Sequence, residues 1–158
     1  MTHEQIQSYT FRVSQANKTE MIVILYDIAL TYIDSCEAAL RADQKREFRK
    51  NIDSLRRTIN ELTASVNTST ELGMTLLRLY IFCGGEITKA YMDYNPDNLE
   101  NIRKVMTKLR DAYKVASSKD TSPAVMQNTE KVYSGFTYSH TGVSENVASV
   151  DAGRGYLA

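Results

Sequence analysis

Residues 20–30 form a run in which apolar side chains would point to nearly every side of a helix. The run reads Glu-Met-Ile-Val-Ile-Leu-Tyr-Asp-Ile-Ala-Leu. A helix at the surface of a bundle needs only one apolar stripe. A helix with this much apolar surface must be covered on more than one side, either by the rest of the chain or by a partner. This run therefore favours a multi-helix fold and a binding protein.

Helical periodicity appears in four segments, which we expect at about residues 18–40, 44–66, 71–94 and 96–117. Asn17 is a good N-cap for the first, and Glu20 completes a capping box. Asp43 is a candidate cap for the second, and Ser69 or Thr70 for the third. Asn95 and a proline at the first helical position open the fourth segment.

Short connections between these segments predict antiparallel neighbours. We therefore expect an all-α protein, an antiparallel up-down-up-down four-helix bundle over residues 17–118. Residues 1–16 would form a short N-terminal arm. Residues 119–158 would form a C-terminal extension with a short fifth helix from Ser122-Pro123 to Gly135, folded back over apolar surface of the bundle.

The first and third helices are apolar on two sides, whereas the second and fourth are apolar on one. In the third helix, Met74, Leu77 and Ile81 add a second face to a core stripe. A closed bundle would leave this surface uncovered, and exposed apolar patches mark binding sites. Gly84-Gly85 in the same helix indicates close packing against a neighbour or a mild kink, or else a place where another backbone approaches closely.

Composition argues against several classes of function. The 158 residues include 19 Lys and Arg and 19 Asp and Glu, so the chain is neutral overall and duplex DNA is not an expected partner. No apolar stretch approaches the about 20 residues that cross a bilayer. No histidine falls in the four helices, and two cysteines alone cannot build a zinc site. We expect no enzymatic activity, no cofactor, no metal and no membrane insertion.

The second helix is locally basic. Its cations are Lys45, Arg46, Arg49, Lys50, Arg56 and Arg57. They form either a solvated face, with acidic residues interleaved, or a contact surface for an acidic partner. RNA binding is disfavoured because no aromatic platform accompanies the charges.

Several motifs, in their order along the chain, resemble the FliS-type flagellin export chaperones. Residues 16–21 and 24–29 (Ala-Asn-Lys-Thr-Glu-Met and Ile-Leu-Tyr-Asp-Ile-Ala) resemble the first helix of that family. Residues 59–66 are similar to its second helix, residues 76–80 to its Leu-x-x-Leu-Tyr stretch, and residues 109–113 to its closing Leu-x-x-Ala-aromatic motif. Ile28 replaces a frequent family glycine, and Tyr113 replaces a frequent tryptophan.

The resemblance implies a cytoplasmic chaperone that binds the C-terminal segment of flagellin in apolar grooves. It would prevent premature polymerisation and deliver the client to the flagellar export gate, as a monomer or weak homodimer. The resemblance also places Tyr9 among the partner-binding residues. The alternative is a self-associating helical adaptor without a client.

The predicted groove combines the two-sided helices with the nearby end of the second helix. We expect its lining to include Met21, Leu25, Tyr26, Leu62, Val66, Leu77 and Tyr80.

Overall fold

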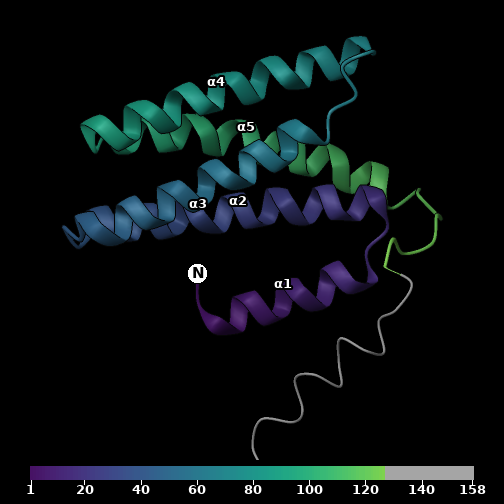
Figure 1. Ribbon diagram of the computed structural model, residues 1–158, viewed down its shortest axis with the longest axis horizontal. Coiled ribbons are helices and arrows are strands. Elements are labelled where there is room, and N and C mark those ends of the chain that lie inside the picture. Colours follow the sequence, from purple (N-terminus) through teal and green to yellow (C-terminus); the bar gives the residue numbers. More distant parts are fainter. Residues whose placement is uncertain (127–158) are drawn as a thin grey trace, which may run out of the picture. The chain divides into compact units, whose positions relative to one another are not determined.

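The structure is a computed structural model that describes residues 1–126. This part of the chain contains five α-helices and no strand, so the predicted all-α class is confirmed (Figure 1). The helices are α1 (His3–Gln15), α2 (Lys18–Arg41), α3 (Lys45–Ala64), α4 (Glu71–Asp93) and α5 (Pro96–Ser117).

Helices α2 to α5 form the predicted up-down-up-down bundle (Figure 1). Each helix contacts the next one along the chain, and α5 closes the bundle by packing against α2. Helices α2 and α4 therefore lie on a diagonal and meet only across the core. Helix α1 packs against α2.

The core is built from one stripe on each bundle helix. In α3 the stripe is Phe48, Ile52, Leu55, Ile59 and Leu62, all buried. Its four-three-four-three spacing follows one face of an α-helix, which is why this helix needs cover on one side only. The two cysteines, Cys36 and Cys83, are free thiols in the same core.

The helix starts follow the capping signals with one exception. Asn17 accepts a hydrogen bond from the Glu20 backbone N–H and completes the predicted capping box, and Thr70 caps α4. Asp43 does not cap α3, which begins after Gln44 without a side-chain cap.

Asp43 instead ends α2. Its φ of 50° is left-handed, and the N–H groups of Asp43 and Gln44 donate to the carbonyls of Leu40 and Ala39. This is a Schellman ending, in which a short polar residue takes the position that glycine often occupies.

The N-terminal arm contains a helix that the sequence pattern did not predict. Helix α1 begins with a capping box in which Thr2 and Gln5 bond each other's backbone N–H. Ser14 is its only buried residue, so α1 lies on the outside of α2 and takes no part in the bundle core.

The start of the C-terminal extension returns to the junction between α1 and α2. Asn17 Nδ2 donates to the carbonyl of Asp120, Thr19 Oγ1 donates to an Asp120 carboxylate oxygen at 2.5 Å, and the Val125 N–H donates to the Ala16 carbonyl. Residues 121–126 are not helical. The rest of the predicted fifth helix, and its predicted fold-back over the bundle, lie outside the described residues.

Candidate partner-binding surface

Three residues of the predicted groove lie inside the core. Tyr26, Leu62 and Tyr80 are all buried. The hydroxyls of Tyr26 and Tyr80 form a hydrogen bond of 2.5 Å across the bundle diagonal, and the ring centroids of Tyr26 and Tyr113 are 5.5 Å apart. These side chains hold the bundle together, and a client cannot reach them while the bundle is closed.

The buried tyrosine pair is electrically neutral. Burial raises the pKa of Tyr26 far above its ordinary value, and the hydrogen bond to Tyr80 raises it further. Burial also raises the pKa of Tyr80 to about 12. Both hydroxyls therefore stay protonated at physiological pH, so their role is structural and not one of acid–base chemistry.

The other predicted groove residues on the bundle are partly accessible. Met21, Leu25, Val66 and Leu77 are each half-buried. Leu25 and Val66 pack against the core with part of their surface. They belong to the same end of the bundle, because α2 and α4 begin where α3 ends (Figure 1).

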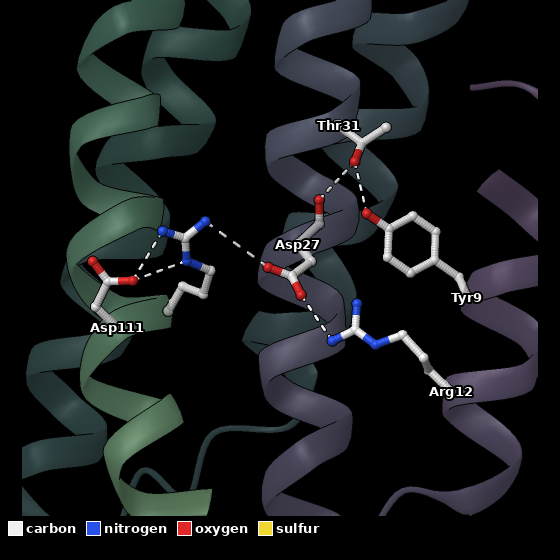
Figure 2. Close-up of polar contacts among 6 residues, drawn as sticks. Tyr9, Arg12, Asp27, Thr31 and Asp111 are labelled. Atoms are coloured by element: carbon white, nitrogen blue, oxygen red, sulfur yellow. Dashed lines mark hydrogen bonds and ion pairs between the residues drawn. The ribbon is translucent and has the colours of Figure 1, made fainter.

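Tyr9 lies apart from these residues, in a polar clasp that holds α1 on α2 (Figure 2). The clasp consists of Tyr9, Arg12, Asp27 and Thr31. The hydroxyls of Tyr9 and Thr31 are 2.7 Å apart, and Thr31 donates to the backbone carbonyl of Asp27. Arg12 forms an ion pair of 2.8 Å with the Asp27 carboxylate.

The clasp explains how the wide apolar run of α2 is covered. A pocket of about 330 Å³ lies along the α1–α2 contact, and its lining residues are Phe11, Arg12, Gln15, Ala16, Glu20, Val23, Ile24 and Ser117. Helix α1 therefore supplies part of the second cover that residues 20–30 require. The clasp contacts that hold it are polar, and the Arg12 side chain is 40% exposed.

Helix α4 has an apolar row on its outer side. Met74, Ile81 and Met92 are 40%, 65% and 71% exposed. Their spacing of seven and eleven residues returns to one face of a helix, opposite the face that holds the buried Cys83 and Ala90. We call the row Met74, Leu77, Ile81, Gly85 and Met92 the α4 seam.

Sequence reasoning found the α4 seam only in part. The site prediction included Leu77 but not Met74, Ile81 or Met92. The sequence contains the signal, because Met74, Leu77 and Ile81 form a second apolar face on the predicted helix. Phe82, which is 47% exposed beside the seam, was also missed.

The Gly84-Gly85 pair lies within this exposed side of α4. A Cβ atom added at either glycine would meet nothing within 4 Å. The expectation that the pair packs closely against another helix of the bundle is therefore wrong. A mild kink, or a place on the helix that an outside backbone could approach closely, stays a prediction.

The described residues offer little for other kinds of chemistry. Among residues 1–126, no group of three or more His, Cys, Asp or Glu side chains is placed to hold a metal ion. No helix in this part of the chain combines the length and the apolar character needed to cross a membrane. The accessible features are apolar surface and charge.

Comparison with known proteins places this bundle in a family. A search of curated proteins finds no match. The family model described as "Flagellar protein FliS" matches residues 1–120, which include all five helices. The chain therefore belongs to the FliS family of flagellar proteins.

Proposed function

We propose that this protein, a flagellar export chaperone by its family, binds the C-terminal segment of flagellin. Binding would keep flagellin from polymerising in the cytoplasm until it is handed to the flagellar export gate. The observation that carries the proposal is the α4 seam, because it leaves large apolar side chains in water on a helix whose other side already fills the core.

A helical client segment fits the seam by its periodicity. Amphipathic helices bind by laying apolar residues at three- and four-residue spacing into a matching surface. Gly85 stands between Ile81 and Met92 and has open space above it. A client helix could therefore approach α4 most closely there, while Ile81 and Met92 pack on either side.

The seam supplies part of the energy of a chaperone contact. Full burial of one large apolar side chain contributes about 1.5–3 kcal/mol. Association costs several kcal/mol in lost freedom of motion. Met74, Ile81 and Met92 are already partly buried and gain only a fraction of the full value each, so binding requires further contacts.

The half-buried residues Met21, Leu25 and Val66 supply a second contact region in this proposal. Met21 and Leu25 belong to α2, the helix that α1 covers. A client that also binds the α2 surface next to α1, around Val23 and Ile24, must displace α1 from the polar clasp. Tyr26, Leu62 and Tyr80 support the surface from inside and need not touch the client.

The test compares two changes from an exposed apolar residue to glutamate. Ile81→Glu places a charge in the seam, and Val115→Glu places one on α5, where Val115 is 60% exposed. A labelled C-terminal fragment of flagellin is titrated with each variant and the wild type. We expect Ile81→Glu to weaken binding by about tenfold or more, which is at least 1.4 kcal/mol. Val115→Glu should change binding by less than about twofold.

Both variants should keep the thermal stability of the wild type, since neither residue is buried. Equal binding by the two variants would refute the seam as the contact. A wild-type protein that does not bind the flagellin fragment at all would refute the client.

A second candidate function is self-association through the same seam. Four residues of the row are placed symmetrically about position 83 in the sequence, so two copies in antiparallel orientation would place Met74 beside Met92 and Ile81 over Gly85. Leu77 would then lie beside Lys89. Such self-complementarity is what a two-fold symmetric interface requires. Sedimentation separates the two candidates. A self-associating adaptor should form a stable dimer, Ile81→Glu should convert that dimer to a monomer, and neither protein should bind flagellin.

A further inference from the structure

Helix α3 concentrates positive charge in a chain that is neutral overall. It contains six Lys and Arg residues and only three carboxylates. Within residues 1–126, the only ion pair made by any of these cations is between Arg56 and Asp53, at 3.8 Å. That pair is exposed and contributes little. The positive charge of α3 is therefore largely available to a partner.

One row of these cations is held against aromatic rings. Arg49 lies 5.5 Å from the ring centre of Tyr91 and 5.9 Å from that of Tyr94, and its Nε donates to the Tyr94 hydroxyl at 2.9 Å. Lys45 lies 5.6 Å from the Tyr94 ring, and Arg56 lies 5.8 Å from the Tyr91 ring. The rings orient these cations without neutralising them, so less freedom is lost when a carboxylate binds.

Tyr94 itself is fixed by its backbone and its packing. Its φ of 52° is in the left-handed region, which is unfavourable for an aromatic residue. Its ring centre lies 5.3 Å from that of the buried Phe48. The position of the ring that carries Lys45 and Arg49 is therefore set by the end of α4 and by the core.

Two pockets adjoin this ring. The smaller, of about 300 Å³, is lined by Lys45, Arg46, Arg49 and Tyr94. The larger, of about 570 Å³, shares Lys45 and Tyr94, and its other lining residues are Glu37, Ala39, Leu40, Arg41, Asp43, Gln44 and Pro96. A basic pocket thus adjoins one whose lining combines the apolar groups of Ala39, Leu40 and Pro96 with charged residues, a combination that suits a carboxylate next to an apolar side chain.

A second row of cations faces outward along α3. Arg46, Lys50 and Arg57 follow one side of the helix and span about 16 Å, at 1.5 Å per residue. All three are exposed, and none has an ion pair within residues 1–126. No large apolar side chain is exposed on α3. We call Lys45, Arg46, Arg49, Lys50 and Arg57 the basic face of α3.

We propose that the basic face of α3 binds an acidic segment of a partner protein, with one apolar or aromatic residue of that segment seated in the larger pocket beside Tyr94. This surface is separate from the α4 seam, so the proposal does not depend on flagellin being the client. The basic face of α3 gives the protein a second binding surface, which is charged where the α4 seam is apolar. A partner can bind to it while a client is held on the seam.

Other partners for this face fit the observations less well. Nucleic acid bases need free ring faces for stacking, but Arg49 already lies against both tyrosines. A membrane surface is bound best where apolar side chains accompany the charge, and α3 exposes none. The chain's own residues 127–158 contain three acidic and two basic residues, so they provide little complementary charge.

The experiment uses a charge-reversed variant and a matched control. Arg46→Glu, Lys50→Glu and Arg57→Glu are combined in one variant, and all three positions are free of the ring contacts that fix Arg49. The control combines Lys108→Glu, Lys114→Glu and Lys119→Glu, which change the net charge equally at exposed positions outside α3. The probe is a labelled glutamate-rich peptide of about 12 residues, three helical turns, with one central phenylalanine.

We expect the wild type and the control to bind the peptide in fluorescence anisotropy, more weakly as salt is added. The α3 variant should bind at least about tenfold more weakly, because three attractions become repulsions. Replacing the phenylalanine of the peptide by alanine should weaken binding several-fold. Circular dichroism melting should show the same fold stability for all three proteins.

The proposal is overturned if the control loses as much affinity as the α3 variant, since binding would then follow net charge alone. It is also overturned if a single-stranded oligothymidine or phosphatidylserine vesicles bind the wild type while the peptide does not. An unchanged affinity for the alanine peptide would remove the pocket from the proposal. Because the flagellin fragment is titrated separately, a failure here is distinguishable from a failure of the proposed client.

Discussion

The hydrogen bond between Tyr26 and Tyr80 places two hydroxyl groups inside an otherwise apolar core. Each buried hydroxyl depends on a partner there, because burial without a hydrogen bond costs about 1–3 kcal/mol. Among the described residues, no buried side-chain oxygen or nitrogen lacks a partner. The pair therefore joins α2 to α4 across the diagonal and helps to select one arrangement of the bundle.

Removal of one hydroxyl tests this structural role. Tyr26→Phe leaves the Tyr80 hydroxyl without its partner and should destabilise the fold by about 1–3 kcal/mol in urea denaturation. The double variant with Tyr80→Phe should lose less than the sum of the single changes. Flagellin binding measured on the folded protein should stay unchanged. If the Tyr26→Phe protein is fully stable but binds the client poorly, Tyr26 contacts the client and belongs to the binding groove.

The buried thiols predict how stability depends on alkaline pH. Burial raises the pKa of Cys36 and of Cys83 to about 12, whereas an unfolded thiol titrates near about 8.5. Between these values the unfolded chain loses protons first, so the free energy of unfolding falls as pH rises. This stability is complete below the unfolded pKa and is lost as pH rises through the folded one.

In the double variant Cys36→Ala with Cys83→Ala, the free energy of unfolding should fall less steeply with rising pH than in the wild type. Urea denaturation at a series of pH values from neutral upward measures this free energy. Some slope should remain, because the pKa values of Tyr26 and Tyr80 are raised as well. Parallel curves for the two proteins would mean that the thiols do not contribute.

At the scale of the helix, α4 combines a core face with an outer seam that is interrupted by glycine. Glycine in the interior of a helix costs about 1 kcal/mol relative to alanine, and no close contact inside the bundle accounts for Gly85. Gly85→Ala should therefore stabilise the isolated protein by about 0.5–1 kcal/mol in thermal denaturation.

The same substitution also tests the seam. If a client helix approaches α4 closely at Gly85, the added methyl group should weaken flagellin binding even though the fold is more stable. Gly73→Ala is the contrasting change, because a Cβ at Gly73 would collide with the backbone carbonyl of Asn67 and should destabilise the fold. Client binding that is unaffected by Gly85→Ala would argue against close approach at this point.

The four bundle helices could be predicted because their signals are local. The Asn17 capping box, the α3 stripe and the Asn95-Pro96 start each depend on residues within a few positions of one another. Helix α1 was missed although Thr2 and Gln5 form a similar box. A helix of 13 residues is marginal by itself, and its packing on α2 is a tertiary effect that periodicity does not reveal.

The client surface was harder to predict than the fold for a physical reason. A helix that is apolar all round gives two candidate inner faces, and sequence alone does not say which one meets the core. Tyr80 and Ile81 are neighbours in the chain, yet one is buried and the other is 65% exposed. The packing of the four helices decides which face is buried. The predicted groove therefore combined buried residues such as Tyr80 with partly exposed ones such as Leu77.

Across the whole molecule, the surfaces of different character belong to different helices. The α4 seam is apolar, the adjacent α3 face is basic, and α2 is covered by α1 on the far side of the bundle from α4 (Figure 1). A bundle arranged in this way can hold an apolar client on one helix and leave charged surface for a second partner. The net charge of zero does not reveal that positive charge is concentrated on α3.

The attachment of α1 is the weakest part of this arrangement. Its polar contacts include the Arg12–Asp27 ion pair, in which the Arg12 side chain is 40% exposed, and the Tyr9–Thr31 hydrogen bond. An exposed ion pair contributes about 0.2–1 kcal/mol, and a hydrogen bond contributes about 0.5–1.5 kcal/mol. Local detachment of α1 therefore costs much less than unfolding of the bundle.

The last prediction separates the motion of α1 from the stability of the bundle. Tyr9→Phe with Arg12→Gln removes both of these polar contacts, keeps the aromatic ring at position 9 and shortens the side chain at position 12. Hydrogen exchange of the α1 amides should become faster by about tenfold, in line with a loss of about 1–2 kcal/mol, while the core amides of α3 should keep their protection. If the client displaces α1 to reach Val23 and Ile24, flagellin affinity should rise in the same variant. Exchange that accelerates equally in α1 and α3 would show that α1 is part of the cooperative fold, and an unchanged affinity would show that the client binds without displacing α1.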